Sequence, residues 1–347
     1  MIGDPSASLG GFHATDLAEV SSDPLVLDGG GRWAVALPYS GAPVLARFRR
    51  WESTDADGTA AARWQGPPVD AWATSLDAHA YRQAVDEVRS AIEVGTVYQA
   101  NLCRVMSADL PDSGAAEAAG LHALLSKGNP APFGGYLSLP EHDVAVVSAS
   151  PELFLGVRAD GHRRSISSGP IKGTGRSESD LSDKDRAENI MIVDLVRNDL
   201  ARITDPGSLR VPALLRVEEH PGLVHLVSVV EGDLRAGTAW PEILDATFPP
   251  GSVTGAPKST ALELIETLET ARRDFYCGAF GWIDADTGEA ELAVAIRTFW
   301  IRDGRLYFGT GAGITWASDP EAEWRETELK AQRLIAVASG TWNPEVS

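Results

Sequence analysis

The sequence has little cysteine, no long apolar run and no excess of positive charge. Only two cysteines occur in 347 residues, and Cys103 and Cys277 lie too far apart for the clustered ligands of a structural zinc site. No apolar run approaches the length of a membrane span, and the N-terminus lacks the charged and then apolar pattern of a signal peptide. These absences predict a cytoplasmic protein in a reducing compartment.

Acidic residues outnumber basic ones: the chain has 49 Asp and Glu residues but only 30 Lys and Arg residues, a net charge of -19. Nucleic acids and anionic membranes repel a chain this acidic, so we expect neither as a partner. An anionic substrate would need a locally positive pocket or a bound metal. With 44% hydrophobic residues the chain can bury a large core, and no low-complexity tract or interior linker divides it.

Hydrophobic alternation predicts strands near the N-terminus. Residues 32–38 and 43–50 alternate like two half-buried strands joined by a turn, whereas residues 1–30 are weakly patterned. We expect residues 1–75 to form a short strand and loop region that belongs to the same body as a catalytic domain at residues 76–340.

A helix is predicted over residues 77–94, because apolar residues recur there at helical spacing and Gly95 ends the pattern. A strand follows from Thr96 to Met106. It carries Gln99 between apolar neighbours, and taken alone Gln99 is typical of an ordinary polar strand residue.

Lys172 stands in the segment Gly169-Pro-Ile-Lys-Gly-Thr-Gly175, which follows a β-like run. Proline fixes φ and glycine lets the backbone approach a ligand, so the segment predicts a lysine on a rigid turn. Glu152 lies between two predicted strands and precedes an apolar run. A carboxylate beside buried surface tends to have a raised pKa, which suits a general acid. Each residue alone would more often be an exposed loop residue.

Two predicted helices carry the same acid pair. The first extends over residues 183–203 after Ser182 as N-cap, and the second begins at Asp319-Pro320. Acids three positions apart share one helix face. One such face is usually solvated, but two suggest four carboxylates around one hard cation such as Mg²⁺. The acids are Asp185 and Glu188 in the first helix and Glu323 and Glu326 in the second.

Further candidates lie between these helices. A strand over 223–234 contains His225, and the loop 248–258 leads into a helix at Pro257, where backbone N–H groups could face an anion. Strands are expected near 276–283, 290–301 and 305–309. Arg297 would lie inside the second of these, and the glycines of 309–313 could donate main-chain hydrogen bonds to a carboxylate.

The motifs together resemble one family. From Tyr81 to Leu334 the chain contains, in order, VYQANL, SPELF, PIKGT, KDRAENIMIVDLVRNDL, HLVS, GSVTGAPK, AIRT, GAGI and EWRETELK. This series is similar to that of the chorismate-utilising enzymes, which include the large components of anthranilate, aminodeoxychorismate and isochorismate synthases. The resemblance implies an α+β fold in which two large antiparallel β-sheets pack face to face with helices outside.

The resemblance also implies roles for the candidate residues. Mg²⁺ would hold the ring carboxylate of chorismate, bound directly by Glu188 and Glu326 and through waters by Asp185 and Glu323. The enolpyruvyl carboxylate would contact Arg297 and Lys330, together with the backbone from Gly311 to Gly313. The remaining implied substrate contacts are His225, Ser252, Thr254, Tyr276, Thr174 and Gln99.

Within the family, Gln99 together with Lys172 resembles the aminodeoxychorismate-forming branch. Lys172 would attack C2 of chorismate while Glu152 protonates the departing C4 hydroxyl, and ammonia would then enter at C4. Neither cysteine has a nucleophile-elbow context, so we expect ammonia from a separate glutamine amidotransferase subunit or from solution. Anthranilate or isochorismate synthesis, and a catalytically idle binding partner, remain as alternatives.

Overall fold

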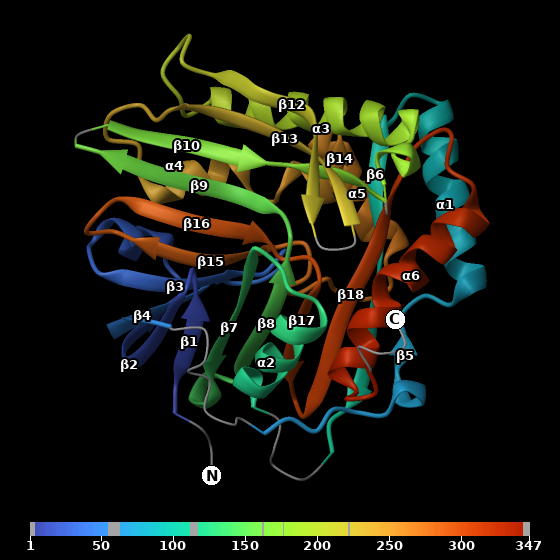
Figure 1. Ribbon diagram of the computed structural model, residues 1–347. Coiled ribbons are helices and arrows are strands. Elements are labelled where there is room, and N and C mark those ends of the chain that lie inside the picture. The colour runs from blue at the N-terminus through green and yellow to red at the C-terminus, as the bar shows by residue number, and fades with distance from the viewer. Residues whose placement is uncertain are drawn as a thin grey trace.

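Antiparallel strands form most of the molecule. The computed structural model describes residues 4–54, 63–111, 117–161, 163–175, 177–220 and 223–342. Within them, hydrogen bonds link 18 strands into one network in which every pairing is antiparallel. The network folds into two stacks whose strands run in different directions (Figure 1).

The first stack contains, in order of pairing, β2 (Phe12–Ser21), β4 (Val44–Ser53), β3 (Arg32–Leu37), β15 (Ala279–Asp284), β16 (Glu289–Val294), β9 (Leu153–Asp160), β10 (Arg163–Gly169) and β13 (Leu223–Asp233). β11 (Ile171–Gly175) and β12 (Arg210–His220) also pair with β13. The second stack contains β1 (Ser6–Leu9), β7 (Phe133–Leu139), β8 (Val144–Ser150), β17 (Thr298–Arg302), β18 (Arg305–Ile314) and β6 (Gln99–Asp109). The short strands β5 (Ala73–Thr74) and β14 (Gly255–Ala256) pair with β6.

Side chains alternate between the two faces of the second stack. Val146 and Trp300 lie in the large core with Phe280 of the first stack, whereas Val147 and Phe299 belong to a second cluster beneath helices. The two stacks therefore pack face to face and helices lie outside, which confirms the predicted fold class. The stacks are also joined edge to edge, since β1 pairs with both β2 and β7.

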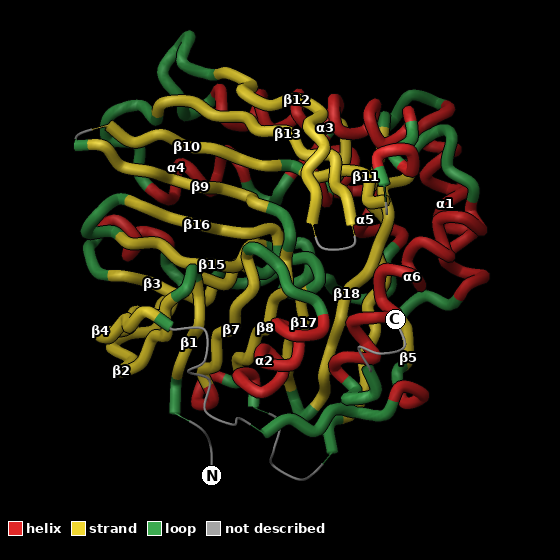
Figure 2. The backbone as a smooth tube through the Cα atoms, in the orientation of Figure 1, coloured by secondary structure: helices red, strands yellow, loops and turns green. Residues whose placement is uncertain are grey.

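The helices surround the strands (Figure 2). They are α1 (Ala78–Glu93), α2 (Ala118–Gly128), α3 (Asp183–Ala201), α4 (Trp240–Thr247), α5 (Lys258–Leu268) and α6 (Pro320–Ala338). The predicted N-cap Ser182 is present on α3, and the helices predicted to begin at Asp77 and Asp319 are capped by those residues, which accept from Ala80 and Ala322. None of these described helices combines the length and apolar composition needed to cross a bilayer.

The N-terminal region contains more strand than its sequence pattern indicates. β1 and β2 lie within residues 1–30, where no element was predicted. Most residues of β2 are half-buried and only Ala14 is fully buried, so the strand shows no clear alternation. The predicted strands at 32–38 and 43–50 are β3 and β4, and β3 pairs with β15.

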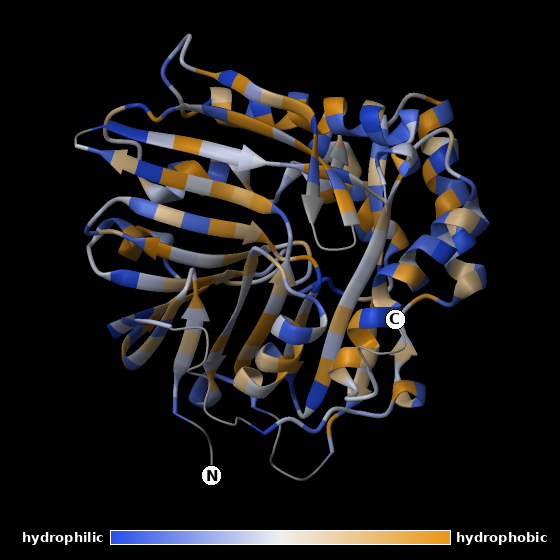
Figure 3. Cartoon of the chain, in the orientation of Figure 1, coloured by the Kyte–Doolittle hydropathy of each residue, from blue (hydrophilic) through white to orange (hydrophobic). Residues whose placement is uncertain are grey.

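The strand order brings the candidate residues to one end of the first stack. Leu153, which begins β9, pairs with Gly169 at the end of β10 and with Ala293 near the end of β16. At this end of the stack, Glu152 immediately precedes β9 and Lys172 lies at the start of β11, just after β10 ends. Arg297 lies between the end of β16 and the start of β17. The opposite ends carry charged turns, seen in blue at the left of Figure 3.

Candidate active site

Lys172 is held by an irregular strand. β10 and β11 run consecutively along β13 with Pro170 between them, and the pairing register shifts between Lys172 and Thr174. Gly173 lies at this bulge with a φ of +73°, which glycine adopts without strain. The half-buried Lys172 donates a hydrogen bond from Nζ to the backbone carbonyl of Ser252 at 3.1 Å. The lysine is therefore fixed against a neighbouring turn rather than directed into bulk solvent.

Glu152 lies beside Lys172 and Ser252 and is only 4% exposed. Burial raises the pKa of its carboxyl group. The charge of Lys172 and hydrogen bonds from the Ser252 side chain and the Ile171 backbone lower the pKa by a smaller amount. The raised pKa favours the neutral acid, the form that can donate a proton. Lys172 and Glu152 thus meet at Ser252, as a nucleophile and an acid would.

The candidate substrate-binding residues near Lys172 and Glu152 differ in whether their polar groups are free to contact a ligand. His225 is buried on β13, and Ser252 is buried in the 3₁₀ turn Gly251–Val253. Thr254 is fully buried, and its hydroxyl donates to the carbonyls of Pro250 and Gly251, so it supports its own turn. Thr174 pairs with His225 in the sheet, but its side chain lies outside the described part of the structure.

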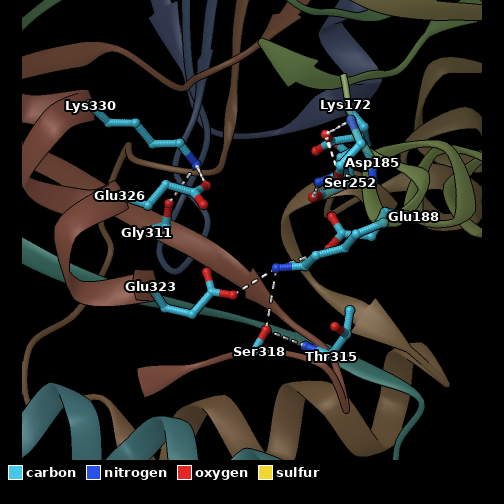
Figure 4. Close-up of polar contacts among 12 residues, drawn as sticks. Lys172, Asp185, Glu188, Ser252, Gly311, Thr315, Ser318, Glu323, Glu326 and Lys330 are labelled. Atoms are coloured by element: carbon cyan, nitrogen blue, oxygen red, sulfur yellow. Dashed lines mark hydrogen bonds and ion pairs between the residues drawn. The ribbon is translucent and has the colours of Figure 1, made fainter. Parts of the chain in front are cut away.

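The four predicted acids come from α3 and α6, and Glu188 of α3 lies across from Glu323 and Glu326 of α6 (Figure 4). Glu188 and Glu323 are 9% and 3% exposed, whereas the side chain of Glu326 is 45% exposed. Burial raises the pKa of Glu188, against the charges of Lys172 and Lys184. Burial also disfavours ionisation of Glu326, but Lys330 at 2.7 Å outweighs it and lowers the pKa of that carboxyl.

Asp185 differs from the other three acids because it caps its own helix. Its Oδ2 accepts hydrogen bonds from the backbone N–H and the hydroxyl of Ser182, at 2.8 and 2.7 Å, which forms a capping box. This oxygen is therefore engaged, and only Oδ1 remains for a cation or its water.

Lys184, which was not among the predicted site residues, lies within the acid cluster. Its Nζ is 2.7 Å from Oε1 of Glu323 and 3.7 Å from Oε1 of Glu188. Burial alone would lower the pKa of Lys184, but the carboxylate of Glu323 outweighs it and raises the pKa. The sequence held a signal for this residue, since Lys184 and Glu188 are one helical turn apart.

A glycine-rich part of β18 lies beside the acids. The strand predicted at 305–309 continues through the main-chain donors of 309–313, because β18 pairs with β6 as far as Ile314. Lys330 donates to the carbonyl of Gly311 at 3.0 Å. In an antiparallel strand the N–H and C=O of one residue point the same way, so this edge of β18 also offers the N–H of Gly311 and of Gly313.

Gly313 allows two side chains to approach the strand. A Cβ atom on Gly313 would lie 2.5 Å from Nε2 of Gln99 and 3.5 Å from Oε2 of Glu188. Gln99 is 1% exposed, and its Oε1 accepts no hydrogen bond from the described residues. Gln99 therefore brings an unsatisfied polar atom to the place where α3 meets β18.

Arg297 does not lie inside a strand, so that expectation was wrong. The predicted strand 290–301 is divided into β16 and β17, and Arg297 lies between them with a φ of +52°. The Ile296 N–H bonds to the Val294 carbonyl, which turns the chain out of the ladder. Burial and the charge of Arg333 lower the pKa of Arg297, and the charge of Glu152 acts in the opposite direction, so Arg297 lies near Glu152.

Tyr276 precedes β15 rather than beginning it, and it is 5% exposed. Its ring packs against the backbone of Gly309, where a Cβ atom would overlap the ring. Burial raises the pKa of its phenol, and the charge of Arg273 acts in the opposite direction. Tyr276 therefore supports β18 from the core side.

Arg273 is a buried residue that the sequence analysis missed. Its guanidinium bonds to the carboxylate of Glu269 and donates to the carbonyls of Val253 and Asn101, at 2.8 and 2.6 Å. These contacts tie the turn that contains Ser252 to strand β6. A lone arginine after a helix carries no sequence signal for such a role.

The acids fit a divalent cation in charge and ligand type. The described residues contain no three such side chains already arranged around one point. However, Oε2 of the buried Glu323 accepts no hydrogen bond, and Glu188 is buried with it. Carboxylate oxygens are the ligands that Mg²⁺ prefers, and an unpaired buried oxygen is costly without a cation or donor.

Comparison with known proteins identifies the family. The sequence pattern of the chorismate binding enzymes matches residues 43–336. The chain is 38% identical over 280 residues to aminodeoxychorismate synthase component 1 of Klebsiella aerogenes, covering 77% of this chain and 59% of the relative. It is 38% identical over 278 residues to anthranilate synthase component 1 of Streptomyces coelicolor, covering 76% and 52%. The chain thus spans little more than half the length of these curated relatives.

The fold is shared as well. A crystal structure of anthranilate synthase component I from Streptococcus pneumoniae superimposes with a TM-score of 0.73 at 25% identity, covering 91% of this chain and 82% of that one. The shared fold and the matched sequence pattern agree, and the chain belongs to the chorismate-binding enzyme family.

Proposed function

We propose that the protein converts chorismate and ammonia to 4-amino-4-deoxychorismate and water. The observation that carries the proposal is the meeting of Lys172 and Glu152 at Ser252, beside the acids of α3 and α6. The charge of Lys172 acts on Glu152, Glu188 and Glu326, so its amine lies near both the acid and two of the proposed metal ligands. Support also comes from the relatives named aminodeoxychorismate synthase.

The chain's own residues account for the steps. Neutral Lys172 attacks C2 of the ring, both ring double bonds shift by one position, and the C4 hydroxyl leaves as water with the proton of Glu152. Ammonia then attacks C4, both double bonds return, and the C2–N bond breaks with its electron pair left on Lys172. The ammonium formed at C4 gives one proton back to Glu152. The amine must be neutral to attack, and the Ser252 carbonyl can hold it in place by accepting a hydrogen bond from Nζ.

Mg²⁺ is the proposed cofactor, held by Glu188 and Glu326 with Asp185 and Glu323 in support. When bound it would neutralise and orient the ring carboxylate of chorismate. Lys330 and the edge of β18 at Gly311 and Gly313 would bind the second carboxylate. These groups make the site locally positive despite the net charge of -19.

A separate glutamine amidotransferase subunit is the proposed source of ammonia, because two relatives are named component 1 of their enzymes. Anthranilate synthesis is the second candidate, since the anthranilate synthase relative is equally identical at 38%. Lys172 favours the first candidate, because amination at C4 needs a nucleophile that occupies C2 and later leaves.

Product analysis tests the proposal. Purified protein is incubated with chorismate, Mg²⁺ and ammonium, and products are identified by mass and chromatographic retention. We expect aminodeoxychorismate from the wild type and none from Lys172→Ala, which should still bind chorismate. Anthranilate or isochorismate as the product would refute the assignment, and full turnover by Lys172→Ala would refute the role of the lysine.

A further inference from the structure

Lys184 occupies a position that a metal ion would also favour. Its ammonium contacts Glu323 at 2.7 Å and Glu188 at 3.7 Å, and it lies 3.5 Å from the hydroxyl of Ser318 (Figure 4). Ser318 is 2% exposed and precedes α6. One amino group therefore links the first turn of α3 to the first turn of α6 and to the segment before it.

The location of this lysine opposes the local preference of its helix. Lys184 is the second residue of α3, where the helix dipole is positive and acidic residues are favoured. Asp183 and Asp185 on either side follow the preference. A cation at this position needs compensation from outside the helix, and Glu323 of α6 supplies it.

We propose that Lys184 is an internal counter-ion that competes with the divalent cation for Glu188 and Glu323, so that metal binding requires its ammonium to leave the acids. This inference rests on the proposed function, because that function supplies the metal. Lys184 would keep the buried acids neutralised while the site is empty of metal, and would thereby weaken the apparent metal affinity.

The geometry permits such an exchange. The side chain of Lys184 is 35% exposed, so its flexible stem can swing toward solvent without opening the core. Glu323 is 3% exposed and keeps Oε2 without a partner even while Lys184 bonds to Oε1. One ammonium thus leaves one buried carboxylate oxygen unsatisfied, whereas a divalent ion with its waters could reach both.

The expected effect follows from population shift. If the lysine occupies the acids in about nine molecules of ten, the apparent metal affinity is about tenfold weaker than that of the open site. Removing the ammonium abolishes this competition. When no metal is present, the same change leaves Glu323 without a counter-ion and Glu188 with Lys172 alone, so the metal-free protein should lose stability.

The test compares Lys184→Met, Lys184→Arg and Arg186→Gln with the wild type at one pH, without chorismate. Arg186 lies on the same turn of α3 but pairs with Glu178 at 3.9 Å, so its replacement removes an equal charge away from the acids. Binding of Mn²⁺ is measured by electron paramagnetic resonance of the free ion, and of Mg²⁺ by calorimetry. Thermal unfolding is recorded in EDTA and in Mn²⁺.

Lys184→Met should bind Mn²⁺ about tenfold more tightly and unfold at a lower temperature in EDTA. Lys184→Arg and Arg186→Gln should both stay close to the wild type in Mn²⁺ affinity. If Lys184→Met folds only when Mn²⁺ is supplied, the ion has replaced the lysine, which also supports the proposal.

Unchanged or weaker Mn²⁺ binding by Lys184→Met, or an equal gain in Arg186→Gln, would overturn the inference. The proposed function fails on a different observation, namely a wild type that makes no aminodeoxychorismate from chorismate, Mg²⁺ and ammonium. The binding measurements are made without chorismate, so the two failures are distinguishable.

Discussion

Replacing Gly173 by alanine tests how the bulge of β11 positions Lys172. The residue has a φ of +73°, and a Cβ atom there would lie 2.9 Å from Cβ of Asp185 and 3.1 Å from Cδ2 of Leu181. Both contacts belong to the segment that starts α3. The added methyl group would therefore push the first turn of α3 away from the strand that carries the nucleophile.

The loss of folding free energy in Gly173→Ala has two parts. A non-glycine residue in the left-handed region costs about 1 kcal/mol, and overpacking by one methyl group costs roughly 1–3 kcal/mol. The free energy of unfolding of Gly173→Ala should therefore fall by about 2–4 kcal/mol. Gly304→Ala is the matched control, because Gly304 has a φ of +70° in the turn between β17 and β18 and nothing lies within 4 Å of its Cβ position.

Urea denaturation gives both values, and the control should lose only the conformational part, about 1 kcal/mol. The stiffer unfolded chain affects both variants equally and cancels in the comparison. We also expect kcat to fall in Gly173→Ala and not in Gly304→Ala, because only the first displaces Lys172 from Asp185 and Glu188. Equal losses of stability in the two variants would refute the packing argument.

Two further predictions concern single residues. For Glu152 the folded pKa is raised, so the folded state holds a proton that the unfolded state has released, and stability falls as pH rises from the unfolded pKa through the folded pKa. Thermal unfolding should therefore show Glu152→Gln to be more stable than the wild type at pH 7 and equal to it at low pH. The same variant should form no product. A stability difference that does not change with pH would contradict this prediction. Gly313→Ala should displace Gln99, because an added Cβ atom crowds the edge of β18. We expect the KM for chorismate to rise about tenfold, with a smaller change in kcat. An unchanged KM would show that this edge does not bind substrate.

The sequence predicted those elements whose signals are local. The helix starts at Asp77, Ser182 and Asp319 were identified because capping residues and apolar spacing are encoded within a few positions. The position of Glu152 between two strands was also correct, because apolar runs mark both strands. Lys172 lies within β11 and not on the predicted turn, because β13 pairs with this segment in spite of its proline and glycines.

Features created by tertiary contacts were not predicted. Glycines at 309–313 indicate a loop by composition, but β6 pairs with this stretch and makes it a strand. Arg297 follows an apolar run that continues into β17, so nothing in the sequence marks the break. The ion pair from Lys184 to Glu323 joins residues 139 positions apart, and a single sequence carries no information on such pairs.

Three of the candidate residues depart from local preference. Arg297 has a positive φ, Lys184 places a cation at a helix N-terminus, and Glu152 is a buried acid with a raised pKa. Each departure costs free energy, and proteins retain such conflicts mainly where function requires them. Lys172 opposes the effect of burial on Glu152, and Glu323 compensates the charge of Lys184, so two of these conflicts are balanced by other residues of the proposed site. The conflicts therefore support the site that the motifs suggested.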